Sequence, residues 1–484
     1  MKLSDPTLLR GQAYVDGDWI DADSGETFDV VDPGNGTVVG AVADVGAAET
    51  RRAIEAADAA WPAWRGLTAK QRSEVLRRWY ELIIENQEDL ALLMTHEMGK
   101  PINESRAEAA FGASFVEWFS EEARRARGEV IPTHDPTKRV LSLKQPVGVV
   151  AAITPWNFPL AMITRKVAPA LAAGCTVVVK PPEDAPLTAL AAADLAARAG
   201  VPAGVLNLVP TSNPAPVGDE LTTNPLVRKL SFTGSTATGK MLMAKAAQTV
   251  KNVSMELGGN APFLVFDDAD VDAAVDGAIA SKYRNNGQTC ICANRILVQD
   301  GVYEEFSKKF AEAVADLKVG PALDESTAIG PLVNDKAIEK VETLVNDALA
   351  KGASALTGGK RHALGYTYYE VTVLTGVTAD MAIASDEIFG PVAPLYRFTT
   401  EEEGVALAND TPFGLASYFY AGDNARIWRV SEGLEYGMVG VNTGLISAVS
   451  SPFGGMKESG IGREGSHEGL EEYLETKYVC VGGI

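Results

Sequence analysis

The sequence predicts an α/β protein with two lobes, the first built on a doubly wound, Rossmann-type parallel sheet, together with a small additional strand element. At 484 residues, the chain is longer than a single hydrophobic core usually supports. From about residue 147, short strands that are apolar on both faces alternate with helices, as in a parallel sheet covered on both sides. A second alternating run extends from residue 262 to about residue 441, which indicates a second α/β domain.

Strands are also expected near both ends of the chain. Residues 14–20 and 27–31 are predicted to form a pair of edge strands, separated by a turn at residues 23–25. Residues 473–481 are predicted to form an exposed strand that needs another edge to pair with. A partner subunit is one source of such an edge.

Three helices are expected before the alternating region. Thr68 and Gln71 form a capping box, after which apolar residues recur at helical spacing. The next helix is expected to end at Gly99, because glycine commonly ends helices and Pro101 follows. A third apolar stripe extends over residues 107–119 and then fades into a charged segment.

The parallel strands follow in order along the chain. In the first lobe they are expected at residues 147–153, 176–179, 205–209, 228–232 and 253–256, and the second lobe begins with a strand at 262–266, a helix at 270–282 and a strand at 295–298. Ligands of open parallel sheets bind beyond the carboxyl ends of the strands. We therefore expect the functional residues at those ends.

Composition excludes several classes of function. Forty-three Lys and Arg against 64 Asp and Glu give a net charge of -21, which repels nucleic acid and anionic lipid at long range. No apolar run is long enough to span a bilayer, so no membrane association is expected. The first residues are polar and resemble neither a secretory signal nor a transit peptide, and a cytoplasmic location is expected.

Cysteine and histidine are few. The four cysteines are too sparse for a disulfide framework, and the four histidines are scattered without a metal-binding spacing. No metal site is therefore expected. A Cys–His pair brought together by folding stays open at this point.

Residues 284–295, Arg-Asn-Asn-Gly-Gln-Thr-Cys-Ile-Cys-Ala-Asn-Arg, form the strongest candidate for a reactive centre. A thiol is a strong nucleophile only as the thiolate, and Gly287 permits a turn that leaves backbone amides free to face the Cys290 sulfur. The alternative is that Cys290 is a small buried hydrophobic residue, the commoner state of a cysteine in a reducing compartment.

Polar residues follow other predicted strands. Glu256, before two glycines, suits a general base, although a surface glutamate before a turn fits equally well. Amides near Ser235 could receive a phosphate at a helix start, but the glycine spacing is not the usual dinucleotide fingerprint. Lys180 and Glu183 could approach ribose hydroxyls or lie in an ordinary loop. The Asn157 amide could donate to an oxyanion.

Together these segments carry a resemblance to a known family. In chain order they are Pro155-Trp-Asn-Phe-Pro, Lys180-Pro, Phe232-Thr-Gly-Ser, Glu256-Leu-Gly-Gly-Asn, Gly287-Gln-Thr-Cys, Glu387-Ile-Phe-Gly-Pro and Pro452-Phe-Gly-Gly. By these motifs, the chain resembles the aldehyde dehydrogenase superfamily from about residue 12 to residue 480. The resemblance implies Cys290 as nucleophile, Glu256 as general base and Asn157 as oxyanion donor. It implies a cofactor site of Thr154, Pro155, Trp156, Lys180, Glu183, Gly234, Ser235, Leu257, Glu387 and Phe389.

The resemblance also implies a division of the chain. Residues 1–128 and 147–257 are expected to form an NAD(P)-binding domain, and residues 258–442 a catalytic domain. Residues 129–146 and 466–484 are expected to form an oligomerisation element, which implies a homodimer or a homotetramer.

Within the superfamily, the closest resemblance is to succinate-semialdehyde dehydrogenases. Met162-Ile-Thr-Arg-Lys, residues 284–295 and Gly444-Leu-Ile-Ser carry it. It implies that Arg165, Arg284 and Ser447 hold the distal carboxylate of a small anionic aldehyde, because guanidinium groups bind carboxylates bidentately. The expected reaction is oxidation of succinate semialdehyde to succinate, through a thiohemiacetal and a thioester on the nucleophile.

Several alternatives stay open. The arginines could be a purely structural pair. If they bind an anion, they do not set the chain length, so glutarate semialdehyde is an alternative substrate. Transfer of the thioester to coenzyme A is a further alternative, which a Glu256 suited to activating water disfavours. A catalytically silent homologue is disfavoured by the intact Cys290 and Glu256.

Two more expectations concern the cofactor and redox chemistry. A carboxylate at Glu183 accepts from ribose hydroxyls and repels a 2′-phosphate, so NAD is expected, with NADP possible because Lys180 is near. In some succinate-semialdehyde dehydrogenases, the pair matching Cys290 and Cys292 forms a disulfide that turns the enzyme off. A bond across one residue would be strained and easily reduced. Cys292 could instead be only a packed small side chain.

Overall fold

The first lobe contains a mixed sheet with five parallel central strands. The computed structural model describes residues 1–484, and the strand order is β2-β1-β9-β8-β7-β10-β11-β21. The strands are β1 (Ala13–Val15), β2 (Asp18–Ile20), β7 (Val149–Ile153), β8 (Thr176–Lys180), β9 (Leu206–Leu208), β10 (Val227–Thr233), β11 (Asn252–Glu256) and β21 (Gly460–Ile461). β9, β8, β7, β10 and β11 run parallel to one another, so the predicted doubly wound sheet is confirmed.

Helices cover both faces of this sheet. Val150 and Ala152 of β7 pack into one hydrophobic core, and Val149 and Ala151 pack into another, because successive strand residues point to opposite faces. The first core contains α5 (Ala161–Ala173) and α6 (Leu187–Arg198), backed by α2 (Ala69–Glu85), α3 (Gln87–Met98) and α4 (Ile102–Glu122). The second contains α1 (Ala47–Arg65), α7 (Pro214–Thr223) and α8 (Thr236–Ala246).

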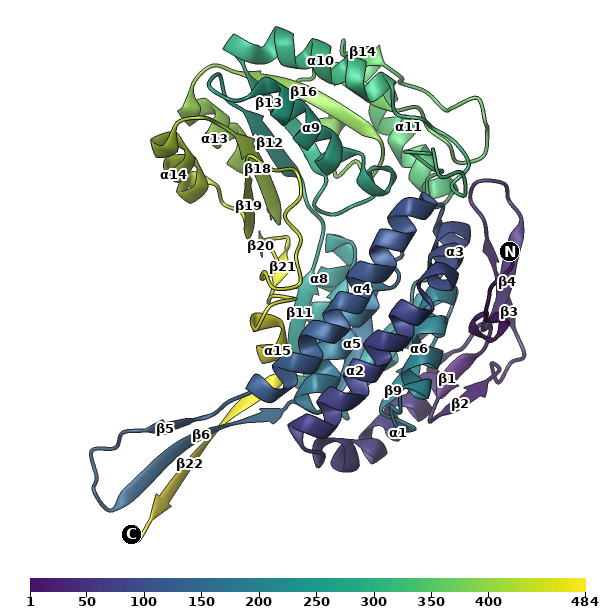
Figure 1. The fold of residues 1–484 in the computed structure, drawn as a ribbon, viewed down its shortest axis with the longest axis vertical. Helices are drawn as coiled ribbons and strands as arrows, with labels where there is room; N and C mark the ends of the chain where they lie inside the picture. Colours follow the sequence, from purple (N-terminus) through teal and green to yellow (C-terminus); the bar gives the residue numbers. More distant parts are fainter.

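The second lobe is built on a seven-stranded sheet, in the order β14-β15-β16-β13-β12-β18-β19. The strands are β12 (Ala261–Val265), β13 (Ala293–Gln299), β14 (Ser354–Thr357), β15 (Thr372–Thr375), β16 (Val392–Phe398), β18 (Ala416–Tyr420) and β19 (Met438–Val441). All pairs are parallel except that of β14 with β15. The predicted second α/β unit is therefore confirmed, and Figure 1 shows it above the first lobe.

Helices pack on the second sheet as well. Phe263 and Val265 of β12 share a core with α9 (Val271–Lys282) and α10 (Tyr303–Ala315). Leu264 shares another with α13 (Glu401–Asn409) and α14 (Asn424–Gly433). α11 (Asp335–Ala350) and α12 (Ala382–Ser385) pack against β15 and β16. Three further short elements are β17 (Phe413–Gly414), β20 (Met456–Lys457) and α15 (Glu468–Glu471).

A strand arm projects from the body of the molecule (Figure 1). It consists of β5 (Glu129–Ile131), β6 (Lys138–Pro146) and β22 (Leu474–Gly482), in the order β22-β6-β5. β22 pairs antiparallel with β6 of the same chain, from Leu474 opposite Pro146 to Gly482 opposite Lys138. The edge that residues 473–481 were predicted to need is therefore supplied by β6 of the same chain, which is far away in sequence, and a partner subunit is not required for it. The outer side of β22 carries the unpaired backbone groups.

The N-terminal strands pair differently from the prediction. β1 and β2 form a hairpin with each other, and β3 (Thr27–Val31) pairs with β4 (Val38–Ala43). Residues 14–20 are thus not one strand. The missed signal is Asp16-Gly17, whose φ angles of 53° and 87° suit the tight hairpin turns that Asp-Gly favours.

The predicted helix ends are mostly confirmed. The Thr68 and Gln71 capping box begins α2, and Gly99, at φ 75°, ends α3. The third helix, α4, begins at Ile102, earlier than the predicted stripe at residues 107–119. Its first turn was missed because the polar residues there conceal the apolar periodicity.

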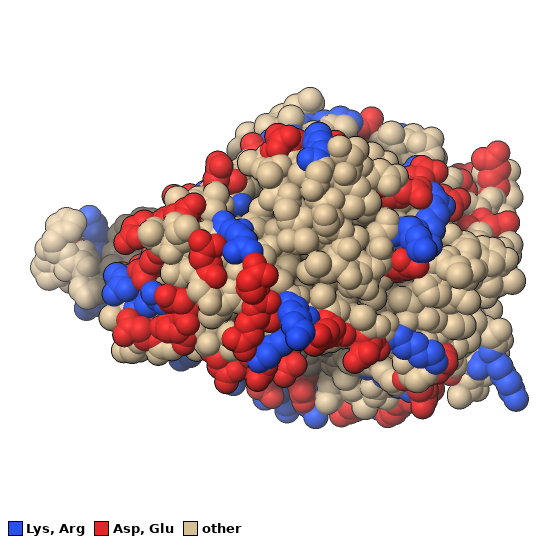
Figure 2. All heavy atoms as spheres, turned by 90° about the horizontal axis from the view of Figure 1, so that it is seen from above, with Lys and Arg blue, Asp and Glu red and all other residues tan.

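Charged side chains of both signs are intermixed on the surface. Figure 2 shows Asp and Glu interspersed with Lys and Arg around a broad uncharged area on the face seen from above. None of the helices is both long enough and apolar enough to cross a bilayer.

Candidate active site

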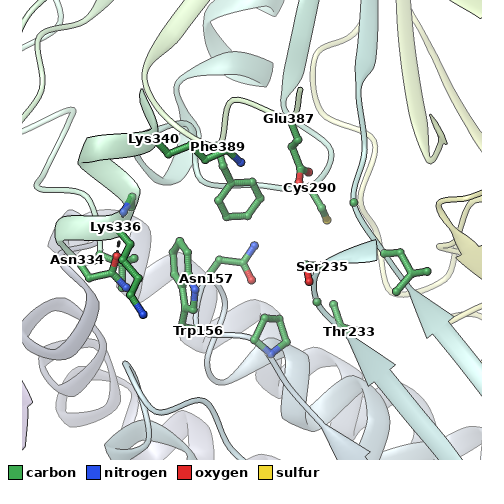
Figure 3. A pocket seen from close by; sticks show the side chains of 16 residues that line it. Trp156, Asn157, Thr233, Ser235, Cys290, Asn334, Lys336, Lys340, Glu387 and Phe389 are labelled. Atoms are coloured by element: carbon green, nitrogen blue, oxygen red, sulfur yellow. Dashed lines mark hydrogen bonds between the residues drawn. The ribbon is translucent and has the colours of Figure 1, made fainter. Parts of the chain in front are cut away.

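A cavity of about 350 Å³ lies where strands of both lobes end. Its walls are Pro155, Trp156, Asn157, Thr233, Gly234, Ser235, Leu257, Gly258, Cys290, Val333, Asn334, Lys336, Ala337, Lys340, Glu387 and Phe389. Figure 3 shows Trp156 and Asn157 facing the side from which Cys290, Glu387 and Phe389 project. Most of the predicted site residues are therefore neighbours. We call this space the main cavity.

The backbone before Cys290 adopts an uncommon conformation. Asn285, Asn286 and Gly287 have φ angles of 54°, 59° and 74°, in the left-handed region that Asn and Gly tolerate best. At Gly287, a Cβ atom would lie 2.2 Å from the Gly390 carbonyl oxygen, so no larger residue fits. The Asn286 amide donates to the Pro331 carbonyl at 2.9 Å. These contacts hold the Cys290 loop in place within the second lobe.

Cys290 is partly exposed, and it also lines a second, narrower cavity. We call this the inner cavity; it is walled by Phe111, Phe158, Ala161, Met162, Arg165, Arg284, Thr289, Cys290, Ile291, Ser447 and Phe453. Cys290 alone lines both the main cavity and the inner cavity. The thiol therefore lies between the two cavities, of which the inner one has a volume of only about 10 Å³.

An outer cavity of about 240 Å³ continues from the inner one, because Arg284 and Ser447 line both. Its other walls include Glu104 and Glu108. The predicted substrate residues thus mark a path from the outer cavity to Cys290.

The two predicted substrate arginines differ in their partners. The Arg165 side chain is 3% exposed, and its Nε lies 2.8 Å from a Glu464 carboxylate oxygen, while its buried Nη2 has no hydrogen-bond partner. The Arg284 guanidinium faces the Phe158 ring, with 5.2 Å from Cζ to the ring centroid. No carboxylate forms an ion pair with Arg284. The sequence did not reveal Glu464 as the neighbour of Arg165.

Both the side chain and the backbone carbonyl of Asn157 form hydrogen bonds. Its Nδ2 donates to the Gln288 carbonyl at 3.2 Å, and its buried Oδ1 has no partner. Its backbone carbonyl accepts from Lys100 Nζ and from Asn285 Nδ2, both at 2.9 Å. One N–H of the amide remains available beside Cys290.

Glu256 lies deeper than the residues around it. It is 4% exposed and lines neither the main cavity nor the inner cavity, and its Oε2 has no hydrogen-bond partner. Burial raises the pKa of its carboxyl well above the usual range, and the negative charge of Glu464 raises it further. The structure therefore places Glu256 near the site, but its side chain does not form part of a wall.

Burial also raises the pKa of the Cys290 thiol above its usual value, and the neighbouring charge of Glu387 adds to this effect. Glu387 accepts a hydrogen bond from the Gly259 amide at 3.0 Å, and burial raises its pKa to about 6. Both effects disfavour the thiolate in this arrangement.

Three predicted cofactor residues lie outside the main cavity. Lys180 Nζ pairs with Glu183 Oε2 at 2.6 Å. Glu183 lines an adjoining cavity that shares Val333 and Asn334 with the main one. Thr154 is buried, and its amide donates to the Lys180 carbonyl at 3.2 Å.

Several walls of the main cavity were not predicted. Asn334 is the N-cap of α11, and Lys336 and Lys340 follow in its first turns, four residues apart on one face. The N-cap signal in Asn334-Asp-Lys was available, but only folding brings this helix against the first lobe.

Cys292 is buried, and all four cysteines are free. Burial raises the pKa of the Cys292 thiol, and the nearby Lys282 amine opposes this rise. Lys282 is fully buried without a hydrogen-bond partner for Nζ, and burial lowers its pKa to about 8. His, Cys, Asp and Glu side chains form no group of three that could hold a metal ion.

Comparison with known proteins identifies the family of the chain. A family model described as "Aldehyde dehydrogenase family" matches residues 19–479. The chain is 61% identical to a glutarate-semialdehyde dehydrogenase of Pseudomonas aeruginosa, with 100% of both chains covered. It is 58% identical to an NADP(+) succinate-semialdehyde dehydrogenase of Escherichia coli, again with 100% of both covered. A crystal structure of succinate-semialdehyde dehydrogenase from Burkholderia pseudomallei is similar with a TM-score of 0.99, 60% identity and 100% of each chain covered.

Proposed function

The chain belongs to the aldehyde dehydrogenase family, and from that premise we propose that it oxidises succinate semialdehyde to succinate with NAD(P). The observation that carries this proposal is the position of Arg284. Its guanidinium lines the inner cavity together with Cys290 and has no ion-pair partner of its own. A substrate carboxylate would supply the missing partner while its aldehyde reaches the sulfur.

The main cavity fits a nicotinamide dinucleotide. Ser235 is the N-cap of α8 and lines the cavity, so the N-terminus of that helix lies at the cavity wall, where helices commonly bind phosphate. A Cβ at Gly234 would lie 2.5 Å from the Phe232 ring, so only glycine fits beside that ring at the cavity wall. Lys336 and Lys340 add positive charge, and Trp156 and Phe389 add aromatic surface. When bound, the nicotinamide accepts the hydride that leaves the aldehyde carbon.

The residues of the chain would then act in sequence. Cys290, as thiolate, attacks the aldehyde carbon and forms a C–S bond, and Asn157 Nδ2 with the Cys290 amide donates to the resulting oxyanion. Loss of hydride from that carbon leaves a thioester on the sulfur. Glu256 takes a proton from water, and the water oxygen attacks the thioester carbon. The C–S bond then breaks, which releases the acid and frees the Cys290 sulfur.

The proposed role of Glu256 requires movement. Because its carboxylate lines neither cavity, the side chain must turn toward the thioester before it can accept the proton of water. The raised pKa of Glu256 brings that carboxyl closer to the range in which a general base works best.

A second candidate substrate is glutarate semialdehyde, which has one more methylene group. The 61% identity to the Pseudomonas aeruginosa glutarate-semialdehyde dehydrogenase favours it. The outer cavity beyond Arg284 leaves room on the same path for a longer chain. Transfer of the acyl group to coenzyme A remains the less favoured alternative, since Glu256 suits the activation of water.

We propose NAD as the preferred cofactor. Glu183 lines the cavity that adjoins the main one, where it would accept from ribose hydroxyls and repel a 2′-phosphate. Its ion pair with Lys180 weakens the repulsion, which supports some use of NADP. The 58% identity to an NADP(+) enzyme of Escherichia coli favours the same dual use.

We also propose a homo-oligomer joined through the strand arm, since the outer side of β22 presents unpaired backbone groups. The division into domains at residues 128, 147, 258 and 442 stays a prediction.

The decisive experiment is an aldehyde panel. It compares kcat/KM for succinate semialdehyde, glutarate semialdehyde, butanal and pentanal, with NAD and with NADP, and with and without coenzyme A. We expect carboxylated aldehydes to exceed uncharged ones of equal length by about 100-fold, since a buried charged pair contributes a few kcal/mol. Equal rates for butanal and succinate semialdehyde would refute the proposed substrate class.

A further inference from the structure

Lys100 is a lysine whose amine is completely enclosed, between the end of α3 and the start of α4. Its side chain is 0% exposed, and Nζ forms an ion pair with Glu108. The same amine donates to the backbone carbonyl of Asn157 at 2.9 Å and lies 4.0 Å from the centroid of the Phe158 ring. Lys100 lines none of the three cavities at Cys290, so it does not touch a substrate there.

Glu108 holds the other end of the same segment. Its Oε1 accepts from the Leu160 amide at 3.1 Å and from the Ala161 amide at 3.3 Å, where α5 begins. No side chain of the N-cap residue serves these amides. Lys100, in the turn before α4, therefore binds the start of the segment 157–161, and Glu108, on α4, binds its end.

Stability alone does not account for a buried ion pair. Moving both charges out of water costs several kcal/mol per ion, and well-packed apolar residues of similar volume often serve as well or better. An apolar pair, however, could not donate to the Asn157 carbonyl. That carbonyl has two donors, Lys100 Nζ and Asn285 Nδ2, so the peptide carrying the Asn157 side chain is held against both the first lobe and the Cys290 loop.

The placement of Asn157 matters chemically because an oxyanion donor works only at hydrogen-bond distance from the oxygen of the transition state. A displacement of about 1 Å at such a group can cost about 100-fold in rate. We propose that Lys100 is a positioning residue that fixes Asn157 for oxyanion stabilisation, through its hydrogen bond to the Asn157 carbonyl. This inference rests on the proposed function, in which Asn157 donates to the oxyanion.

The first test uses Lys100→Met, which keeps the length of the side chain but removes the donor. We expect the pre-steady-state burst of NADH, which reports formation of the thioester, to slow by about 10- to 100-fold. Substrate affinity should stay within about threefold, because methionine preserves the packing on Phe158. Alkylation of Cys290 by iodoacetamide forms no oxyanion, so its rate should stay within about twofold. A comparable loss in alkylation would overturn the proposal.

A double variant removes the effect of stability. Lys100→Met leaves Glu108 buried and unpaired, whereas Lys100→Met with Glu108→Gln removes both charges of the pair. We expect the double variant to regain most of the lost Tm while the burst stays slow. Lys229→Met is the matched control, since Lys229 is also buried and paired with Glu472, and it lines none of the three cavities at Cys290. It should lower Tm without slowing the burst. Recovery of both Tm and burst in the double variant would refute a positioning role.

Asn157→Ala separates this inference from the proposed function. Loss of an oxyanion donor costs about 100- to 1,000-fold, and an unchanged burst in Asn157→Ala would overturn the assignment of Asn157 and the inference with it. A slow burst in Asn157→Ala with a normal burst in the Lys100 and Glu108 double variant would overturn the inference alone. With Asn157 removed, the double variant should slow the burst by less than about threefold further, because coupled residues are not additive.

Discussion

Arg165 and Arg284 line the same inner cavity beside Cys290, but only Arg165 has a carboxylate partner, with its Nε 2.8 Å from Glu464 Oε2. Arg284 forms no ion pair, and its guanidinium faces the Phe158 ring. A bound anion therefore gains most from Arg284, whereas Arg165 can offer its unpartnered Nη2 as a second donor. Both arginines have the same predicted role, but in the fold they differ in their ion-pair partners.

The first prediction concerns Arg284→Ala. We expect kcat/KM for succinate semialdehyde to fall by about 100-fold, because the variant loses a charge-assisted hydrogen bond to the carboxylate. For butanal, the change should be below about threefold. Steady-state kinetics on the two aldehydes measure the difference. An equal loss for both would show that Arg284 is structural.

The second prediction concerns the pH dependence of Cys290. Burial raises its pKa, and only the thiolate reacts, so the reactive fraction rises about tenfold per pH unit below that pKa. In the Cys292→Ala variant, alkylation by iodoacetamide should therefore accelerate continuously from pH 7 to pH 9. The measurement is the pseudo-first-order rate of inactivation without cofactor. A plateau below pH 8 would contradict it.

The third prediction concerns cofactor choice. Glu183→Ser removes the carboxylate that repels a 2′-phosphate and releases Lys180 from its ion pair. We expect the ratio of kcat/KM for NADP to that for NAD to rise by at least about tenfold, the equivalent of one charge contact. Glu183→Gln keeps the side-chain length and serves as control for packing. An unchanged ratio in both variants would remove Glu183 from cofactor selection.

The fourth prediction concerns the cysteine pair. Hydrogen peroxide should inactivate the wild-type enzyme reversibly, with activity restored by dithiothreitol, because Cys292 can trap oxidised Cys290 as a disulfide. In Cys292→Ala the Cys290 sulfur lacks this protection, and a larger share of the loss should be irreversible. Recovered activity after reduction is the measurement. Equal recovery in both proteins would assign Cys292 to packing alone.

The fifth prediction concerns Glu97, a buried carboxylate that accepts from the Leu187 and Thr188 amides where α6 begins. Burial raises its pKa from 4.5 to about 7. Below pH 4.5 its stabilising contribution is complete, and it is lost as pH rises toward 7, because the unfolded chain releases the proton first. The loss is about 3 kcal/mol for this shift.

Denaturant unfolding at pH 5 and at pH 8 tests this expectation. Glu97→Gln cannot titrate, so the fall in unfolding free energy between the two pH values should be smaller than in the wild type by part of that amount. An identical fall in both proteins would show that other buried carboxyls carry the pH dependence.

The alternation of apolar strands and helices predicted both sheets, because residues buried on both faces must be apolar whatever the details of packing. The Thr68 capping box and the end of α3 at Gly99 were equally local signals. The pairing of residues 14–31 was mispredicted although Asp16-Gly17 carried the local hairpin signal.

By itself, the sequence determined the class of the fold, the family and the identity of Cys290 as the candidate nucleophile, since these depend on local patterns and on the order of motifs. Only the tertiary structure decided that Glu464 pairs with Arg165, that Lys340 reaches the main cavity and that β22 pairs with β6. Each of these relationships joins segments distant in the chain. Such contacts are set by the packing of two lobes and an arm, which no local pattern encodes.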